Sequence, residues 1–133
     1  MLGSSSPGRR RLAFTRRMRL RRASEFRAVL AGGIRKAVGP LNVYALPNEL
    51  GQPRLGLAVS RRVGGAVVRN RIKRRMREAF RLMQHDLPTG YDLVISARPH
   101  EMLTLAEYQH LLSKAVRVLH RSWTEKPSQS DDR

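Results

Sequence analysis

The residues best suited to bind a ligand form a dense basic run in the middle of the chain. From Arg61 to Arg81 there are nine cationic side chains and one anionic side chain, Glu78. Guanidinium groups can hold a phosphate through two hydrogen bonds and can stack on bases. A solvated helix face is the alternative, but such faces ordinarily mix charges of both signs. The run therefore favours binding of a polyanion, and nucleic acid is the obvious one.

The charge of the whole chain supports this interpretation. The 133 residues include 27 Lys plus Arg and 10 Asp plus Glu, a net charge of +17. Residues 1–81 hold 21 basic and 3 acidic side chains, whereas residues 82–133 hold 6 and 7. A surface with so much like charge repels itself unless a polyanion neutralises it. Of the 27 cations 23 are Arg, which suits phosphate binding but equally fits a codon bias.

Side chains for catalysis or metal binding are sparse. The absence of cysteine excludes a disulfide scaffold, a thiol nucleophile and a Cys-ligated metal. The basic region holds only Glu25, Glu49 and Glu78, on three separate elements, whereas a metal-dependent nuclease needs clustered carboxylates. The histidines lack metal-ligand spacing, and no phosphate loop, dinucleotide fingerprint or nucleophile elbow occurs. The chain is therefore interpreted as a binding protein without a catalytic constellation of its own.

The basic run is expected on a helix spanning residues 66–83. At 100° per residue its apolar side chains fall within an arc of about 120°. These are Val68, Ile72, Met76, Ala79, Phe80 and Met83. The opposite arc carries Asn70, Lys73, Arg74, Arg77 and Arg81, with Arg69 at its edge and Arg71 on the far flank. Gly64 and Gly65 precede the helix and expose its first N–H groups, a weaker anion-binding signal.

Further elements must position this helix. A short helix is expected after Ser24 as N-cap, ending at the glycines 32 and 33. Alternating residues predict strands at 41–46 and 55–59, paired antiparallel with each other. In the second strand one face consists of small residues, Gly56, Ala58 and Ser60. Either a packed helix or a ligand could therefore approach that backbone closely.

The C-terminal third is predicted to be structural. A third strand is expected at 91–97, after a turn at 88–90. Thr104 and Glu107 form a capping box that begins a long last helix. Its apolar face carries Leu105, Tyr108, Leu112, Ala115 and Leu119.

Both ends of the chain are polar. Residues 1–13 are interpreted as a flexible basic arm, with a short transit peptide as the alternative, and residues 123–133 as a frayed polar tail. No apolar run reaches the roughly 20 residues of a membrane-spanning helix, and no secretory signal is evident. A single soluble, cytoplasmic domain is expected.

The segment AVVRNRIKRRMREAF, residues 66–80, resembles the RNR signature of the bacterial ribonuclease P protein family. The surrounding order is similar to that family as well. RLR at 19–21 precedes a Glu-Phe helix, a Tyr-bearing strand and GLAVSRR at 56–62 follow, and FRLMQHDLP at 80–88 leads into an apolar strand. The resemblance covers roughly residues 14–121.

The resemblance implies an α+β fold, a single-domain α/β sandwich at residues 14–122 like the second domain of ribosomal protein S five. About four strands in a mostly antiparallel sheet, three helices and a left-handed βαβ crossover are expected. Only three strands are evident from the pattern itself. Left-handed crossovers are rare, so no general rule predicts one.

The resemblance also implies two sets of site residues. Binding of the precursor tRNA leader is implied for Phe26, Leu30, Asn42, Tyr44, Arg69, Lys73 and Arg77. Binding of the catalytic RNA is implied for Arg61, Arg62, Asn70, Arg71, Arg74 and Arg81. Leu30 stands where many relatives carry a second aromatic residue, and Asn42 where some carry valine. Phe26 has core packing as an equal alternative, because a short helix must bury something.

The function implied is that of a protein subunit of ribonuclease P. In that family the RNA subunit removes the 5′ leader of precursor tRNA, using Mg²⁺ held mainly by the RNA. Two alternatives remain: a ribosomal or ribosome-assembly protein of the same fold type, and a DNA-binding module. A half-apolar helix is hard to insert into a DNA groove, which disfavours the latter.

Overall fold

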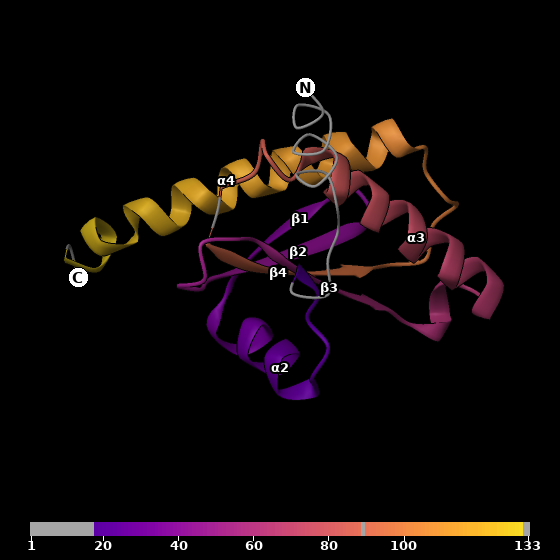
Figure 1. The fold of residues 1–133 in the computed structure, drawn as a ribbon, viewed down its shortest axis with the longest axis horizontal. Helices are drawn as coiled ribbons and strands as arrows, with labels where there is room; N and C mark the ends of the chain where they lie inside the picture. The colour runs from indigo at the N-terminus through magenta and orange to yellow at the C-terminus, as the bar shows by residue number, and fades with distance from the viewer. Residues whose placement is uncertain (1–17, 89, 132–133) are drawn as a thin grey trace, which may run out of the picture.

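The computed structural model describes residues 18–88 and 90–131, with side chains described up to Glu125. Three α-helices, a short 3-10 helix (Arg61–Val63) and four strands are found there (Figure 1). The helices are α2 (Ala23–Gly32), α3 (Ala66–Met83) and α4 (Leu105–Asp131). The strands are β1 (Ile34–Val38), β2 (Leu41–Pro47), β3 (Arg54–Val59) and β4 (Tyr91–Ala97). The predicted basic arm at residues 1–13 lies outside the described residues.

The strands form one mixed sheet in the order β1-β2-β4-β3. β4 is the last strand in sequence but an inner strand of the sheet, antiparallel to β2 and parallel to β3. The predicted antiparallel pairing of the 41–46 and 55–59 strands is therefore wrong, because β4 lies between them. The five residues Tyr91–Ile95 are all buried, as expected for an inner strand covered on both faces.

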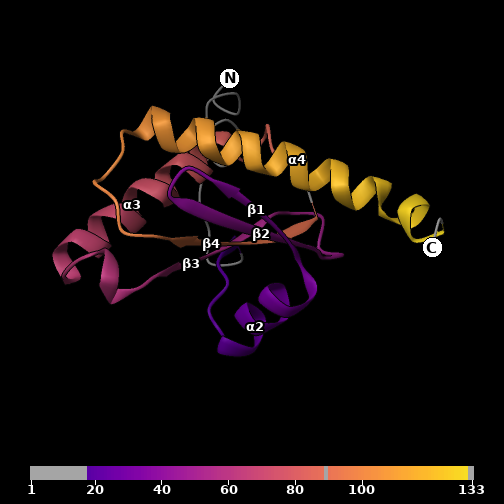
Figure 2. The same cartoon turned by 180° about the vertical axis from the view of Figure 1, so that it is seen from behind.

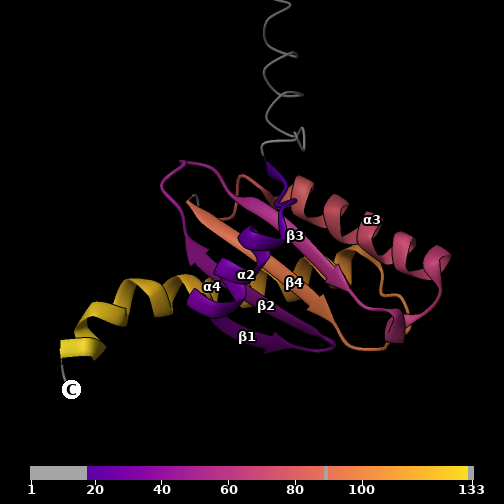
Figure 3. The ribbon, with the colours of Figure 1, turned by 90° about the horizontal axis from the view of Figure 1, so that it is seen from below.

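The connection from β3 through α3 to β4 is a left-handed crossover. Figure 3 is seen from the side of α2, with α3 behind the sheet. When the two parallel arrows are turned to point upward, β4 lies to the right of β3, and a connection behind the sheet is then left-handed. Most βαβ units have the opposite hand.

The strand not seen in the sequence pattern is β1. It pairs antiparallel with β2 across a tight turn at Gly39 and Pro40, where Gly39 has a φ of +54°. Its side chains are mostly exposed or half-buried, because it is an edge strand. The signal that could have revealed it is the Gly-Pro turn between two short runs of strand-forming residues.

The main core lies between one face of the sheet and the pair α3 and α4. Figures 1 and 2 show both helices on the side of the sheet opposite α2. Phe80 of α3 and Tyr108 of α4 are its largest fully buried side chains, packed on Leu41, Val43 and Ile95. The predicted faces of both helices are confirmed with one exception. Val68 is 43% exposed, because the first turn of α3 extends beyond the core.

The other face of the sheet is only partly covered. α2 packs there through a small cluster of Leu20, Val29 and Val94. Phe26, Tyr44 and Leu46 flank this cluster and are half-buried. This division confirms the alternation predicted for residues 41–46.

The helix ends follow the sequence in part. The capping box of α4 is confirmed, since Glu107 N–H donates to Thr104 Oγ1 (3.1 Å) and Thr104 N–H to Glu107 Oε1 (2.9 Å). Ser24 is not the N-cap of α2; that position is Arg22, and Glu25 Oε1 accepts from the N–H groups of Arg21 and Arg22.

α4 continues as a helix to Asp131, where a frayed tail was expected after residue 122. Trp123 joins the helix to the sheet at this point, because its indole N–H donates to the Ala45 carbonyl of β2 at 2.8 Å. No helix among the described residues is both long and apolar enough to cross a bilayer.

Candidate nucleic-acid interface

An ion-pair cluster holds α2 at one end of the sheet. Arg54 of β3 pairs with Asp92 of β4 (Nη2 to Oδ2, 2.7 Å) and with Glu25 of α2 (Nη1 to Oε2, 3.3 Å). Asn48 adds a hydrogen bond to Asp92 Oδ1 at 2.6 Å. The hydrogen bonds that Arg54 donates to Asp92 raise the pKa of Arg54, and the backbone N–H groups of Arg22 and Arg21, which donate to Glu25, lower the pKa of Glu25. The helix is therefore fixed over the first residues of β3.

Phe26 fills the small-residue face of β3. A Cβ placed on Gly56 would lie 2.6 Å from Phe26 Cζ, so only glycine permits this contact. Of the two alternatives for Gly56, a packed helix side chain or a ligand, the structure shows the first. Phe26 is thus largely a packing residue, with its half-exposed edge toward solvent.

Beyond Phe26 the sheet is left open. One row of cross-strand neighbours on the α2 face is formed by Ala37, Asn42, Ser96 and Ala58. Ala37 and Ala58 are exposed, and Asn42 and Ser96 are half-buried. We call these four residues the open row. Tyr44 lies in the adjacent row and is half-buried, so its ring has one side on the α2 cluster.

A basic stripe runs along α3 beside the edge strand β3. Arg69, Lys73 and Arg77 are spaced by four and are all half-buried. Arg69 is oriented by a hydrogen bond from Nε to the Gly64 carbonyl, at 3.2 Å. Burial, followed by the nearby charge of Arg19, lowers the pKa of Arg77.

Arg19 places this stripe relative to the sheet. It forms a bridge with Leu55 of β3, and the next residue, Leu20, packs on the α2 face over Gly56. α3, which carries the stripe, runs alongside the β3 edge of the sheet (Figure 3), and Arg77 of the stripe feels the charge of Arg19 at that edge. Arg19 belongs to the RLR segment noted in the sequence but was not among the predicted site residues.

Four other residues predicted to bind RNA lie on α2, on β2 and before α3. Asn42 accepts a hydrogen bond from Arg98 at 3.4 Å, and Leu30 is 45% exposed on α2. Arg61 and Arg62 are exposed in a short 3-10 helix between β3 and α3.

The residues implied to bind the catalytic RNA differ in their surroundings. Asn70, Arg71 and Arg74 are exposed on α3. Arg81 is ion-paired with Glu78 at 2.5 Å, an interaction that raises the pKa of Arg81 and lowers that of Glu78. The charge of Arg81 is thus already partly compensated.

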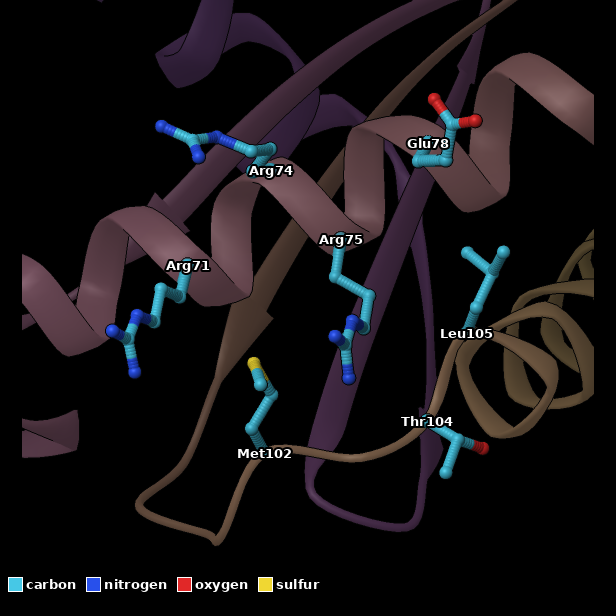
Figure 4. A pocket seen from close by; sticks show the side chains of 7 residues that line it. All are labelled: Arg71, Arg74, Arg75, Glu78, Met102, Thr104 and Leu105. Carbon is cyan, nitrogen blue, oxygen red and sulfur yellow. The ribbon is translucent and has the colours of Figure 1, made fainter.

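On the other side of α3 is an open pocket of about 700 Å³ (Figure 4). We call it the α3–loop pocket, because α3 forms one wall and the residues before α4 form the other. Its lining residues are Arg71, Arg74, Arg75, Glu78, Met102, Thr104 and Leu105. Arg71 and Arg75 extend from α3 toward Met102, and Arg75 donates to the Leu103 carbonyl at 3.0 Å. Sequence reasoning included Arg71 and Arg74 but missed Arg75 and Met102.

The described part of the chain contains no group of three or more Asp, Glu or His side chains that could hold a metal ion. Its carboxylates beside the basic surfaces are engaged with arginines: Glu25 and Asp92 with Arg54, and Glu78 with Arg81. Within the described residues, these carboxylates are therefore arranged as partners of arginine and not as a cluster of metal ligands.

The fold and surface together define a class: a small α+β protein with a parallel strand pair at one edge of its sheet, a basic helix and an open sheet face. The family model for ribonuclease P matches residues 14–122. The chain is 37% identical over 123 residues to the ribonuclease P protein component of Desulfovibrio desulfuricans, covering 91% of this chain and 95% of that one. It is 39% identical over 112 residues to that of Photobacterium profundum, covering 84% and 95%.

Solved structures agree with the sequence matches. The RNase P protein of Staphylococcus aureus superposes with a TM-score of 0.68 at 29% identity, covering 76% of this chain and 94% of that one. The protein from Thermotoga maritima gives 0.67 at 29% identity, covering 77% and 96%. This chain belongs to the family of bacterial ribonuclease P protein components. Membership assigns it a general role in tRNA 5′ processing.

Proposed function

We propose that the protein binds the catalytic RNA of ribonuclease P and the 5′ leader of precursor tRNA. In this proposal it assists Mg²⁺-dependent removal of the leader, while the RNA carries the catalysis. The observation that carries it is that the open row and Tyr44 lie on one face of the sheet, while α3, which carries the basic stripe, runs along the β3 edge of the same sheet. A single-stranded RNA leader that lies there would meet a flat polar surface with cations along one side.

The chemistry of this surface suits many leader sequences. Arg69, Lys73 and Arg77 can neutralise phosphates, which are the same in every leader. Tyr44 offers a ring on which any base can stack, a contact worth about 1–3 kcal/mol. The open row has no large side chain that would exclude a base. Since Phe26 is packed on Gly56, Tyr44 is the main stacking residue in this proposal.

The protein's part in magnesium dependence is electrostatic. The cations at the interface lower the repulsion between closely packed phosphates of the two RNAs, so the RNA can fill its Mg²⁺ sites at a lower concentration. The acidic side chains of the protein beside this surface are held by arginines and do not compete for the ion.

The test is cleavage of a precursor tRNA at low Mg²⁺ by the catalytic RNA of the source organism, with and without the purified protein. We expect release of the 5′ leader only when both are present. Tight RNA binding without stimulation of cleavage would contradict the proposal and return the ribosome-assembly alternative, which co-sedimentation with ribosomal subunits would then examine.

A further inference from the structure

We propose that the α3–loop pocket binds one unpaired nucleotide of the catalytic RNA. Its base would lie against Met102 and Leu105, and a phosphate on Arg71, whose side chain extends to the loop side of α3 in Figure 4, with Arg74 on the outer side of the helix. The inference rests on the proposed function, because it names the part of the RNA partner that this side of α3 contacts. It concerns a surface separate from the one proposed for the leader.

The pocket combines an apolar seat with cations at its rim. Met102 is 39% exposed in a loop, and Leu105 is half-buried and lines the pocket on the other side of Arg75 (Figure 4). A thioether is polarizable and makes favourable contacts with aromatic rings. A volume of about 700 Å³ can hold one nucleotide but not a base-paired helix. An unpaired base is therefore the aromatic group that fits.

The charges favour a phosphate rather than a neutral ligand. Within the described residues, neither Arg71 nor Arg74 has an ion-pair or hydrogen-bond partner. The one carboxylate in the lining, Glu78, is paired with Arg81. Arginine binds phosphate oxygens through two parallel hydrogen bonds, which suits an RNA backbone entering and leaving the pocket.

The loop that carries Met102 is fixed in place before any ligand arrives. His100 is hydrogen-bonded to the Arg98 carbonyl (2.8 Å) and to the hydroxyl of buried Tyr108 (2.7 Å). The same hydroxyl accepts the Leu103 N–H at 3.4 Å, and Arg75 binds the Leu103 carbonyl. A preformed site costs less ordering entropy on binding.

Helix geometry separates this pocket from the leader surface. At 100° per residue, Arg71 and Arg75 each lie about 160° around α3 from Lys73, the middle of the basic stripe, and Arg74 lies about 100° from it. A single RNA strand cannot lie on both of these sides of α3 without passing around the helix. Two different RNA segments are therefore the simplest occupants.

The first test uses the absence of cysteine, which makes any introduced thiol unique. Met102→Cys, labelled with a photoreactive azidophenacyl group, is irradiated in complex with the catalytic RNA. The matched control is Leu82→Cys, because Leu82 is similarly exposed (37%) on α3 but does not line the pocket. We expect cross-links from position 102 at one short unpaired stretch of the RNA, and none at that stretch from position 82.

The second test adds one negative charge inside or outside the pocket. Thr104→Asp keeps an N-cap residue for α4, whereas Ala106→Asp adds the same charge to the same helix turn outside the lining. We expect Thr104→Asp to weaken RNA binding roughly tenfold and Ala106→Asp by less than about twofold. Thermal unfolding of both variants shows whether the fold is retained.

Distinct outcomes separate this inference from the proposed function. Identical cross-links from positions 102 and 82, cross-links confined to paired regions, or equal losses for both Asp variants would overturn the pocket. Protection of residue 102 by free adenosine monophosphate, without RNA, would reassign it to a small nucleotide and also overturn the inference. Failure of the wild-type protein to stimulate leader removal would instead remove the proposed function.

Discussion

At the scale of single residues, two contacts decide what the α2 face of the sheet can do. Gly56 admits the ring of Phe26, and Arg77 brings a partly desolvated cation to the edge of the same face. The first concerns packing and the second, in the proposed function, phosphate binding, so substitutions at Gly56 and Arg77 should affect different measurements.

We expect Arg77→Ala to weaken binding of precursor tRNA by the holoenzyme more than binding of mature tRNA. The missing cation removes a leader phosphate contact, so the slope of log affinity against log salt should fall by about one. Arg117→Ala, an exposed arginine of α4, is the control. Equal weakening for both tRNAs would count against a leader contact at Arg77.

Gly56→Ala should destabilise the fold by about 1–3 kcal/mol, because the new methyl group would overlap the ring of Phe26. Gly32→Ala is the matched control, since a Cβ there would lie 3.5 Å from Leu46, an ordinary contact. Urea unfolding followed by circular dichroism measures both. A neutral Gly56→Ala would show that Phe26 can move away from β3 without loss.

At the scale of elements, the position of α2 depends on the Arg54 cluster. Among the ion pairs of the described residues, only those of Arg54 connect α2 to β4, because Arg54 pairs with both Glu25 and Asp92. α2 in turn determines how much of the sheet stays open. The open row is thus exposed because α2 is held over the other end of the sheet.

The ion pair between Glu25 and Arg54 predicts that the stability of the protein depends on pH. The pKa of Glu25 is lowered in the folded state, so its contribution is present above the unfolded pKa of about 4.3 and is lost as pH falls through the folded value. We therefore expect Glu25→Gln to reduce the stability of the protein at pH 7 and to narrow its difference from wild type below about pH 4. Chemical unfolding at a series of pH values measures this. A difference that stays constant with pH would show that the charge of Glu25 contributes nothing.

The sequence predicted the positions of helices and strands better than it predicted which strands pair in the sheet. α3 was predicted at its observed bounds, because Ile72, Met76 and Phe80 repeat with helical period on a cationic background. The neighbours of β3 could not be inferred, since alternation in residues 55–59 reports a half-buried strand but not which strand lies beside it. For the site, residue types and the family motif indicated the stripe. Met102 and Arg75 meet only in the folded chain, so no spacing rule marked them as a pocket.

At the scale of the whole molecule, the charge of +17 is a cost to the isolated protein. We expect its melting temperature to rise between 50 and 500 mM NaCl, because salt screens the repulsion among the cations. Sulfate at equal ionic strength should stabilise it further, since a divalent anion can bind clustered arginines. Differential scanning fluorimetry measures both effects. A melting temperature that falls with salt would show that the native ion pairs outweigh the repulsion.

α3 has cations on two sides that are well separated around its axis, and this arrangement makes the helix a spacer. A helix with its side chains is about 10–12 Å across, and it does not compress. RNA strands bound to opposite sides of α3 would be held at least this helix diameter apart, in a fixed relative direction. If the proposed function holds, the diameter of this helix would set the distance between the leader and the catalytic RNA. A shift of one turn in the register of α3 would then move the contacts of both RNAs along the helix without changing the total charge.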